Sequence, residues 1–166
     1  MFTFIIGGSA SGKSRFAEEL VCGLEGRRIY LATMEPWDEE CVQRIRRHQR
    51  MRAEKEFTTL ECYRGLEKLS VPKESNVLLE CMGNLLANEM FADEPRDGEA
   101  VLNGVLKLAM QCRHLTVVSD EVFSSGDRYE EGTRRYMRSL ARINRALAAR
   151  ADRAAEVTCG LPVWLK

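Results

Sequence analysis

Short runs of apolar residues alternate along this chain with longer stretches in which apolar positions repeat every three or four residues. The short runs are typical of buried strands, and they predict strands over 2–6, 29–32, 77–79 and 115–119. The longer stretches predict helices over 13–23, 38–54, 85–91, 101–111 and 133–151. Strands that alternate with helices indicate an α/β fold with a mostly parallel sheet and helices on both of its faces.

The segments between these elements carry residues that favour turns. We predict loops over 92–99, which is acidic, and over 124–132, which is polar and contains glycine. The end of the chain, 157–165, is broken by Gly160 and Pro162 and predicts one or two short strands. The chain contains no internal repeat and no linker, so we expect one domain.

The composition excludes several classes of protein but does not identify the function. A hydrophobic content of 45% and a charged content of 30% suit a soluble domain of residues 1–166. Basic and acidic residues balance at 25 each, so no long-range field attracts nucleic acid. The apolar runs are too short to span a membrane, no secretory leader is evident, and the six cysteines form no CxxC pair. We therefore expect a cytoplasmic protein with reduced thiols, no zinc site, no nucleic-acid partner and no membrane segment.

A phosphate-binding motif follows the first predicted strand. The motif GxxxxGK[ST] is matched by Gly7, Gly8, Ser9, Ala10, Ser11, Gly12, Lys13 and Ser14. The glycines let the backbone aim N–H groups at phosphate oxygens, Lys13 can reach the β- and γ-phosphates, and Ser14 can hold Mg²⁺. The preceding strand and the following helix are the context that such a loop needs, which argues against a chance glycine-rich turn. The sequence therefore predicts a P-loop protein that binds a nucleoside triphosphate.

Glu80 follows the predicted strand 77–79 directly. An acid at this place in a P-loop sheet is suited to hold Mg²⁺ or one of its waters. Without the phosphate loop, an ordinary carboxylate facing solvent would be the simpler interpretation. Asp120 and Glu121 end another strand and compete for the same role. We predict that Ser14 and Glu80 hold the metal.

His48, one of two histidines, lies in a predicted helix, four residues from both Arg44 and Arg52. Residues at this spacing share one helix face. Cations this close disfavour a protonated ring and attract phosphates, which suits a histidine that attacks phosphorus. The simpler interpretation is a solvated basic face with an incidental histidine, and spacing alone favours it. His114 precedes a strand and has no comparable setting.

Together these motifs resemble the bifunctional adenosylcobinamide kinase/adenosylcobinamide-phosphate guanylyltransferase family of cobalamin biosynthesis. The resemblance covers nearly the whole chain and is carried by GGSASGKSRFAEEL, IYLATMEPWDEE, RIRRHQRMR, FTTLE, LLECMGNLLANEMF, DEV at 120–122, and RINRALAARAD. The phosphate loop is common to many kinases, whereas RIxxHxxxR between an IYLAT strand and a TxE element is more specific.

The resemblance implies a RecA-like sheet, often assembled as a homotrimer, and two reactions that use Mg²⁺, ATP and GTP. The first phosphorylates the aminopropanol hydroxyl of adenosylcobinamide, and the second transfers GMP from GTP to that phosphate. By this resemblance His48 and Lys13 are catalytic, with His48 matching the histidine that carries GMP, and 7–14 match the triphosphate site. The implied guanine-nucleotide contacts are Ala32, Thr33, Met34, Gln49, Arg50, Met51, Arg52, Glu61 and Glu80.

The chain departs from the family pattern in three places. Ala53 follows Arg52 where a proline is usual, one extra residue precedes Phe57 where a tryptophan is usual, and 120–126 replaces an NEVGxGxVP segment. Two alternatives therefore stay open: a P-loop kinase of another small molecule, and a nucleotide-binding scaffold that has lost catalysis. The intact phosphate loop and His48 count against the scaffold.

Overall fold

The computed structural model describes residues 1–123 and 129–166, and of Arg44 and Met51 only the backbone. Its strands are β1 (Phe2–Gly7), β2 (Arg28–Ala32), β3 (Phe57–Glu61), β4 (Asn76–Glu80), β5 (His114–Asp120), β6 (Arg153–Thr158) and β7 (Leu161–Trp164). Its helices are α1 (Lys13–Cys22), α2 (Glu39–Arg52), α3 (Met82–Met90), α4 (Gly98–Gln111) and α5 (Glu131–Arg150), with a 3-10 turn, η1, at Leu66–Lys68.

The strands form one sheet in the order β3-β2-β4-β5-β1-β6-β7. Every neighbouring pair is parallel except β6 and β7, which form an antiparallel hairpin at one edge. The phosphate-loop strand β1 is therefore flanked by β5 and β6, and β4 lies one strand beyond β5. The carboxyl ends of β1, β2, β4 and β5 lie at the same end of the sheet, which is where α/β proteins bind ligands.

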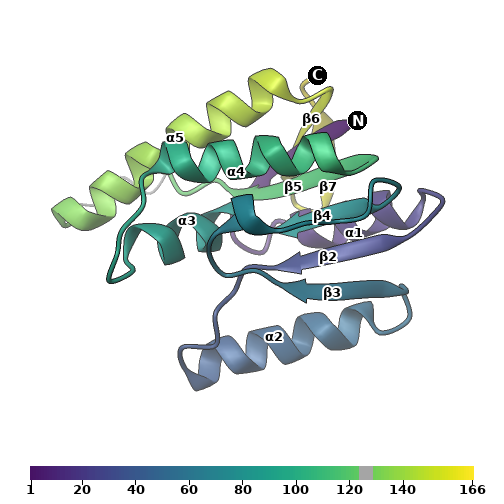
Figure 1. Cartoon of the computed structure of the whole chain (residues 1–166), viewed down its shortest axis with the longest axis horizontal. Helices are drawn as coiled ribbons and strands as arrows, with labels where there is room; N and C mark the ends of the chain where they lie inside the picture. Colours follow the sequence, from purple (N-terminus) through teal and green to yellow (C-terminus); the bar gives the residue numbers. More distant parts are fainter. Residues whose placement is uncertain (124–128) are drawn as a thin grey trace.

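Alternate residues of the buried strands point to opposite faces, and each face has its own apolar cluster. Phe4, Leu79 and Val117 face the larger cluster, which α3, α4 and α5 cover. Ile5 and Leu78 face a smaller cluster beneath α1. Burial on both faces explains why these strands read as continuous apolar runs. The predicted α/β fold, with a mostly parallel sheet and helices on both faces, is confirmed (Figure 1).

Helix α2 differs from the others because it lies beside the edge strand β3 rather than over the centre of the sheet (Figure 1). It begins where predicted, and the Asp38 side chain accepts a hydrogen bond from the backbone N–H of Cys41 at 2.7 Å. Such a cap satisfies one of the free N–H groups of the first turn. The sequence pattern did not reveal β3, because Thr58 and Thr59 are exposed and interrupt its apolar positions.

Two predicted boundaries were wrong. Helix α4 starts at Gly98 inside the predicted acidic loop, because the Asp97 side chain caps it by accepting from the N–H of Ala100 at 2.9 Å. Helix α5 starts at Glu131, also earlier than predicted. The rest of the predicted loop at 124–132 lies mostly outside the described residues, which omit 124–128.

Candidate functional site

The phosphate loop connects β1 to α1, as the motif predicts. A side chain at Gly7 would place a Cβ 2.6 Å from the carbonyl oxygen of Val157, and Gly12 has φ +92°, which disfavours any other residue. The β6–β7 turn closes over the loop, since the N–H of Gly160 donates to the carbonyl of Ser11 at 2.8 Å. The backbone of the loop is thus built into the sheet and oriented before any ligand arrives.

Lys13 points back across the loop to the end of β5. Its Nζ lies 2.9 Å from Oδ1 of Asp120 and donates to the carbonyl of Gly8 at 3.0 Å. Asp120 is one of the two acids that competed with Glu80 for the metal role. The Cys81 thiol donates to the other Asp120 oxygen, Oδ2, at 3.0 Å. This carboxylate therefore lies beside the position that phosphates would take.

Cys81 has no counterpart among the predicted site residues. It joins β4 to α3 with φ +73°, a conformation unusual for a non-glycine residue, and its sulfur accepts from the N–H of Asn84 at 3.4 Å. Burial and the neighbouring Asp120 charge raise the pKa of this thiol, so it stays protonated and acts as a donor. No sequence motif could have found it, because its contact with Asp120 depends on two strands meeting.

Glu80 and His48 are brought together, although 32 positions separate them in the chain. Nδ1 of His48 lies 2.9 Å from Oε1 of Glu80, and the hydroxyl of Tyr30 donates to Oε2 of the same carboxylate. Helix α2, which carries His48, therefore does bring this histidine to the carboxyl end of the sheet, where the phosphate loop lies. One partner of the ring is thus a carboxylate, which the spacing of arginines along the helix did not predict.

The pKa of Glu80 is raised to about 8, first because the carboxyl is buried and then because Glu18 is negatively charged nearby. Asp120 acts in the same direction, whereas the cation of Lys13 opposes it. These acids and Lys13 therefore influence one another electrostatically across a small region. Among the described residues, no group of three or more His, Cys, Asp or Glu side chains could hold a metal ion, so a divalent cation here would also need oxygens from the nucleotide or from hydroxyl groups.

Polar contacts attach the end of α2 to the body of the protein. The guanidinium of Arg52 lies 3.4 Å from the centre of the Tyr30 ring, and Nζ of Lys55 lies 2.6 Å from a carboxylate oxygen of the buried Glu18. Arg52 is itself 6% exposed, which places it beneath the helix rather than on a solvated face. Burial lowers its pKa, and the charge of Glu18 opposes that change.

The remaining predicted contacts divide between the interior and the surface. Thr33 is fully buried and its hydroxyl donates to the carbonyls of Glu80 and Cys81. Its neighbours Ala32 and Met34 are half-buried at the end of β2, while Gln49 and Arg50 are exposed on α2. The side chain of Met51 lies outside the described residues.

Glu61 ends β3 and lines an open cleft of about 470 Å³. The other lining residues come from the end of β2 and from the segment after β3, and they include Glu35, Tyr63 and Arg64. Glu35 and Arg64 approach to 3.7 Å. The cleft therefore adjoins the edge of the sheet that carries the other predicted contacts.

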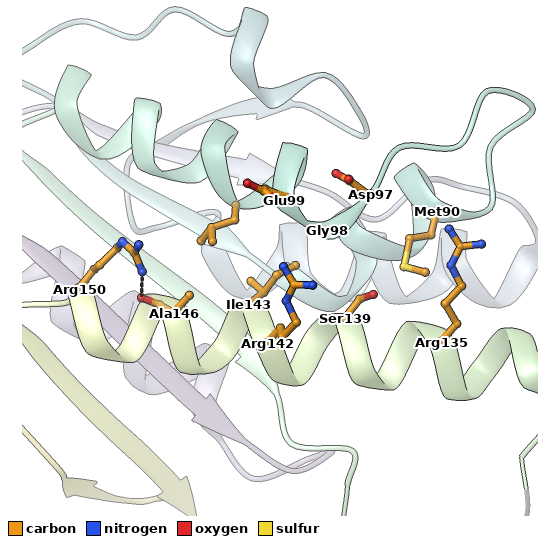
Figure 2. A pocket seen from close by; sticks show the side chains of 11 residues that line it. Met90, Asp97, Gly98, Glu99, Arg135, Ser139, Arg142, Ile143, Ala146 and Arg150 are labelled. Carbon is orange, nitrogen blue, oxygen red and sulfur yellow. Dashed lines mark hydrogen bonds between the residues drawn. The ribbon is translucent and has the colours of Figure 1, made fainter.

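A second hollow lies elsewhere, between α4 and α5 (Figure 2). It has a volume of about 240 Å³ and is lined by arginines of α5, among them Arg135 and Arg142, opposite Asp97 and Glu99 of α4. No predicted site residue lines it. The site residues predicted from the sequence therefore lie outside this hollow.

The raised pKa of Glu80 predicts how the ligand-free protein responds to pH. The folded chain keeps a proton that the unfolded chain releases above about pH 4.5, so stability falls as pH rises from there to about 8. Glu80→Gln cannot ionise and is expected to gain stability relative to the unchanged protein by on the order of 1.4 kcal/mol per pH unit in that window. Urea unfolding in EDTA across the window measures this difference. Parallel stability curves for the two proteins would contradict the environment described for Glu80.

No helix in the described part of the chain is long and apolar enough to cross a membrane. Comparison with known proteins addresses the family directly. A family model described as cobinamide kinase / cobinamide phosphate guanyltransferase matches residues 3–165.

Three curated relatives match along their length. The bifunctional adenosylcobalamin biosynthesis protein CobU of Salmonella typhimurium is 31% identical over 184 positions that cover all of both chains. The protein of the same name from Escherichia coli is 29% identical, again over all of both chains. The bifunctional adenosylcobalamin biosynthesis protein CobP of Pseudomonas aeruginosa is 30% identical over all of this chain and 98% of its own. Because the family model spans nearly every residue and the relatives match from end to end, this chain belongs to the cobinamide kinase / cobinamide phosphate guanyltransferase family.

Proposed function

We propose that this chain phosphorylates adenosylcobinamide and then transfers GMP from GTP to the resulting phosphate through His48. The observation that carries the proposal is that His48 contacts Glu80 at the carboxyl end of the sheet, where Lys13 also contacts Asp120. Family membership supports the two reactions, and this geometry supports the residues that perform them.

For phosphorylation, the phosphate loop holds the triphosphate through its backbone N–H groups and Lys13. In the ligand-free protein the ammonium of Lys13 is paired with Asp120, and incoming phosphate oxygens compete for it. The γ-phosphorus accepts an oxygen of the cobinamide alcohol, the bond to the bridging oxygen breaks, and the nucleoside diphosphate leaves. Positioning and charge neutralisation provide most of the catalysis in such transfers.

For guanylyl transfer, the Nδ1–H of neutral His48 points to Glu80, which leaves the lone pair of Nε2 free to attack. An N–P bond to the α-phosphorus forms while the bond to the bridging oxygen breaks, and pyrophosphate leaves. A phosphate oxygen of adenosylcobinamide phosphate then attacks the same phosphorus, and the N–P bond breaks. The covalent intermediate divides one difficult transfer into two easier steps.

Ser14 and Glu80 stay our proposed ligands for Mg²⁺, with Asp120 as the competing carboxylate beside Lys13. The metal supplies charge that neutralises the phosphate oxygens when it is bound. If Glu80→Gln turns over normally, the assignment moves to Asp120 or Glu121. Homotrimeric assembly, a cytoplasmic location and the use of ATP beside GTP stay predictions.

Incubation with nucleotide, Mg²⁺ and either adenosylcobinamide or its phosphate tests the function. We expect adenosylcobinamide phosphate from the first substrate and the GDP-linked product from the second, both identified by mass, and neither in excess EDTA. Phosphorylation without guanylyl transfer would support a simpler kinase. Nucleotide binding with no product from either substrate would indicate a scaffold.

A further inference from the structure

Tyr30 is a buried residue for which the two proposed reactions give no role. It lies in the middle of β2, is 1% exposed, and packs in the apolar cluster beneath α1 with Ile5, Val21 and Leu78. A phenylalanine would fill the same space. The hydroxyl is therefore the distinguishing group, and its hydrogen-bond partner is Oε2 of Glu80. A buried phenol needs such a partner, and here that partner also contacts His48.

The position of the Tyr30 ring is set from two sides. The guanidinium of Arg52 lies over its face, 3.4 Å from the ring centre. Phe57 meets it nearly edge-on, with ring centres 6.0 Å apart and an interplanar angle of 76°. Cation–π and edge-to-face contacts of this kind restrict where a ring can lie. These two contacts hold the ring in place, and its hydroxyl therefore keeps a fixed position beside Glu80.

Arg52 and His48 are four residues apart on α2, so they lie one helical turn from each other. The contacts therefore form a closed circuit: His48 to Glu80, Glu80 to Tyr30, Tyr30 to Arg52, and Arg52 through the helix back to His48. Each carboxylate oxygen of Glu80 has one partner in the circuit. Rotation of the carboxylate would disturb the hydrogen bond from Tyr30 and the 2.9 Å contact with His48 together.

We infer that Tyr30 is a positioning residue for guanylyl transfer, whose hydroxyl holds Oε2 of Glu80 so that Oε1 faces Nδ1 of His48. This inference rests on the proposed role of His48. Without the hydroxyl the core keeps its volume, but the Glu80 side chain is free to turn away from the imidazole. Removal of the Tyr30 hydroxyl should therefore disturb the orientation of His48 and leave nucleotide binding intact.

The test is Tyr30→Phe, measured in single-turnover formation of GMP-His48 from α-labelled GTP. We expect the rate constant at saturating GTP to fall about tenfold or more, since a hydrogen bond to a charged group is lost. The dissociation constant of GTP is expected to stay within about twofold, because the hydroxyl faces Glu80 and not the phosphate loop.

Val21→Ala is the matched control, because it loosens the same apolar cluster and keeps the Tyr30 hydroxyl and its contacts with Arg52 and Phe57. It should lower the melting temperature without a comparable loss of rate. An equal rate in Tyr30→Phe and the unchanged protein would overturn the inference while His48 keeps its role. A rate loss matched by an equal loss of GTP affinity would overturn it as well. Absence of any acid-labile label in the unchanged protein would instead overturn the proposed function.

Discussion

Replacing His48 by asparagine is expected to abolish covalent attachment of GMP, because the other site nitrogen, Nζ of Lys13, is an ammonium paired with Asp120. Asparagine retains a polar side chain on α2 but has no basic lone pair. With α-labelled GTP and Mg²⁺, the unchanged protein should acquire a label that acid removes and base does not. After digestion the label should map to the peptide that contains His48. The loss should approach the detection limit, the largest effect that we expect of any single substitution.

His114→Asn provides the matched control. His114 is the other histidine of the chain and begins β5. It therefore lies at the amino end of the sheet, away from the phosphate loop at the carboxyl end. It should label like the unchanged protein. Phosphorylation should stay measurable in His48→Asn, since that reaction uses the loop and the metal. A label that persists in His48→Asn would show that another residue carries GMP.

Lys13→Ala is expected to weaken GTP binding at least about tenfold. Charge-assisted contacts to phosphate contribute roughly 1.5–3 kcal/mol each, and about 1.4 kcal/mol corresponds to a factor of ten. The substitution also removes the partner of Asp120, whose side chain is 27% exposed and can be solvated instead. We therefore expect the fold to survive. Calorimetric titration with GTP measures the affinity, and thermal unfolding checks the fold.

Lys73→Ala controls for the loss of one positive charge. Lys73 is exposed just before β4, at the amino end of the sheet, so its removal should leave GTP affinity unchanged. Equal affinities of Lys13→Ala and the unchanged protein, with both folded, would remove the loop lysine from nucleotide binding. A similar loss in both lysine variants would indicate a general effect of charge.

The buried strands β1, β2, β4 and β5 and the phosphate loop could be predicted from residue order, because both depend on local pattern. Buried parallel strands need apolar residues on both faces, and the loop needs glycine at positions such as Gly12, where φ is +92°. The ends of elements were less predictable. Asp97 caps α4 four residues before the predicted start at Val101, and the edge strand β3 has exposed threonines that hide its periodicity.

Spacing alone favoured an incidental histidine on a basic helix face. The folded chain adds what spacing could not give, since α2 returns along the sheet and brings His48 within 2.9 Å of Glu80. Tyr30 and Cys81 belong to the site for the same reason, as each meets a carboxylate from another strand. Hydrophobic periodicity records which residues are buried along one element. Which polar groups then meet depends on how separate elements pack, and no local pattern encodes that.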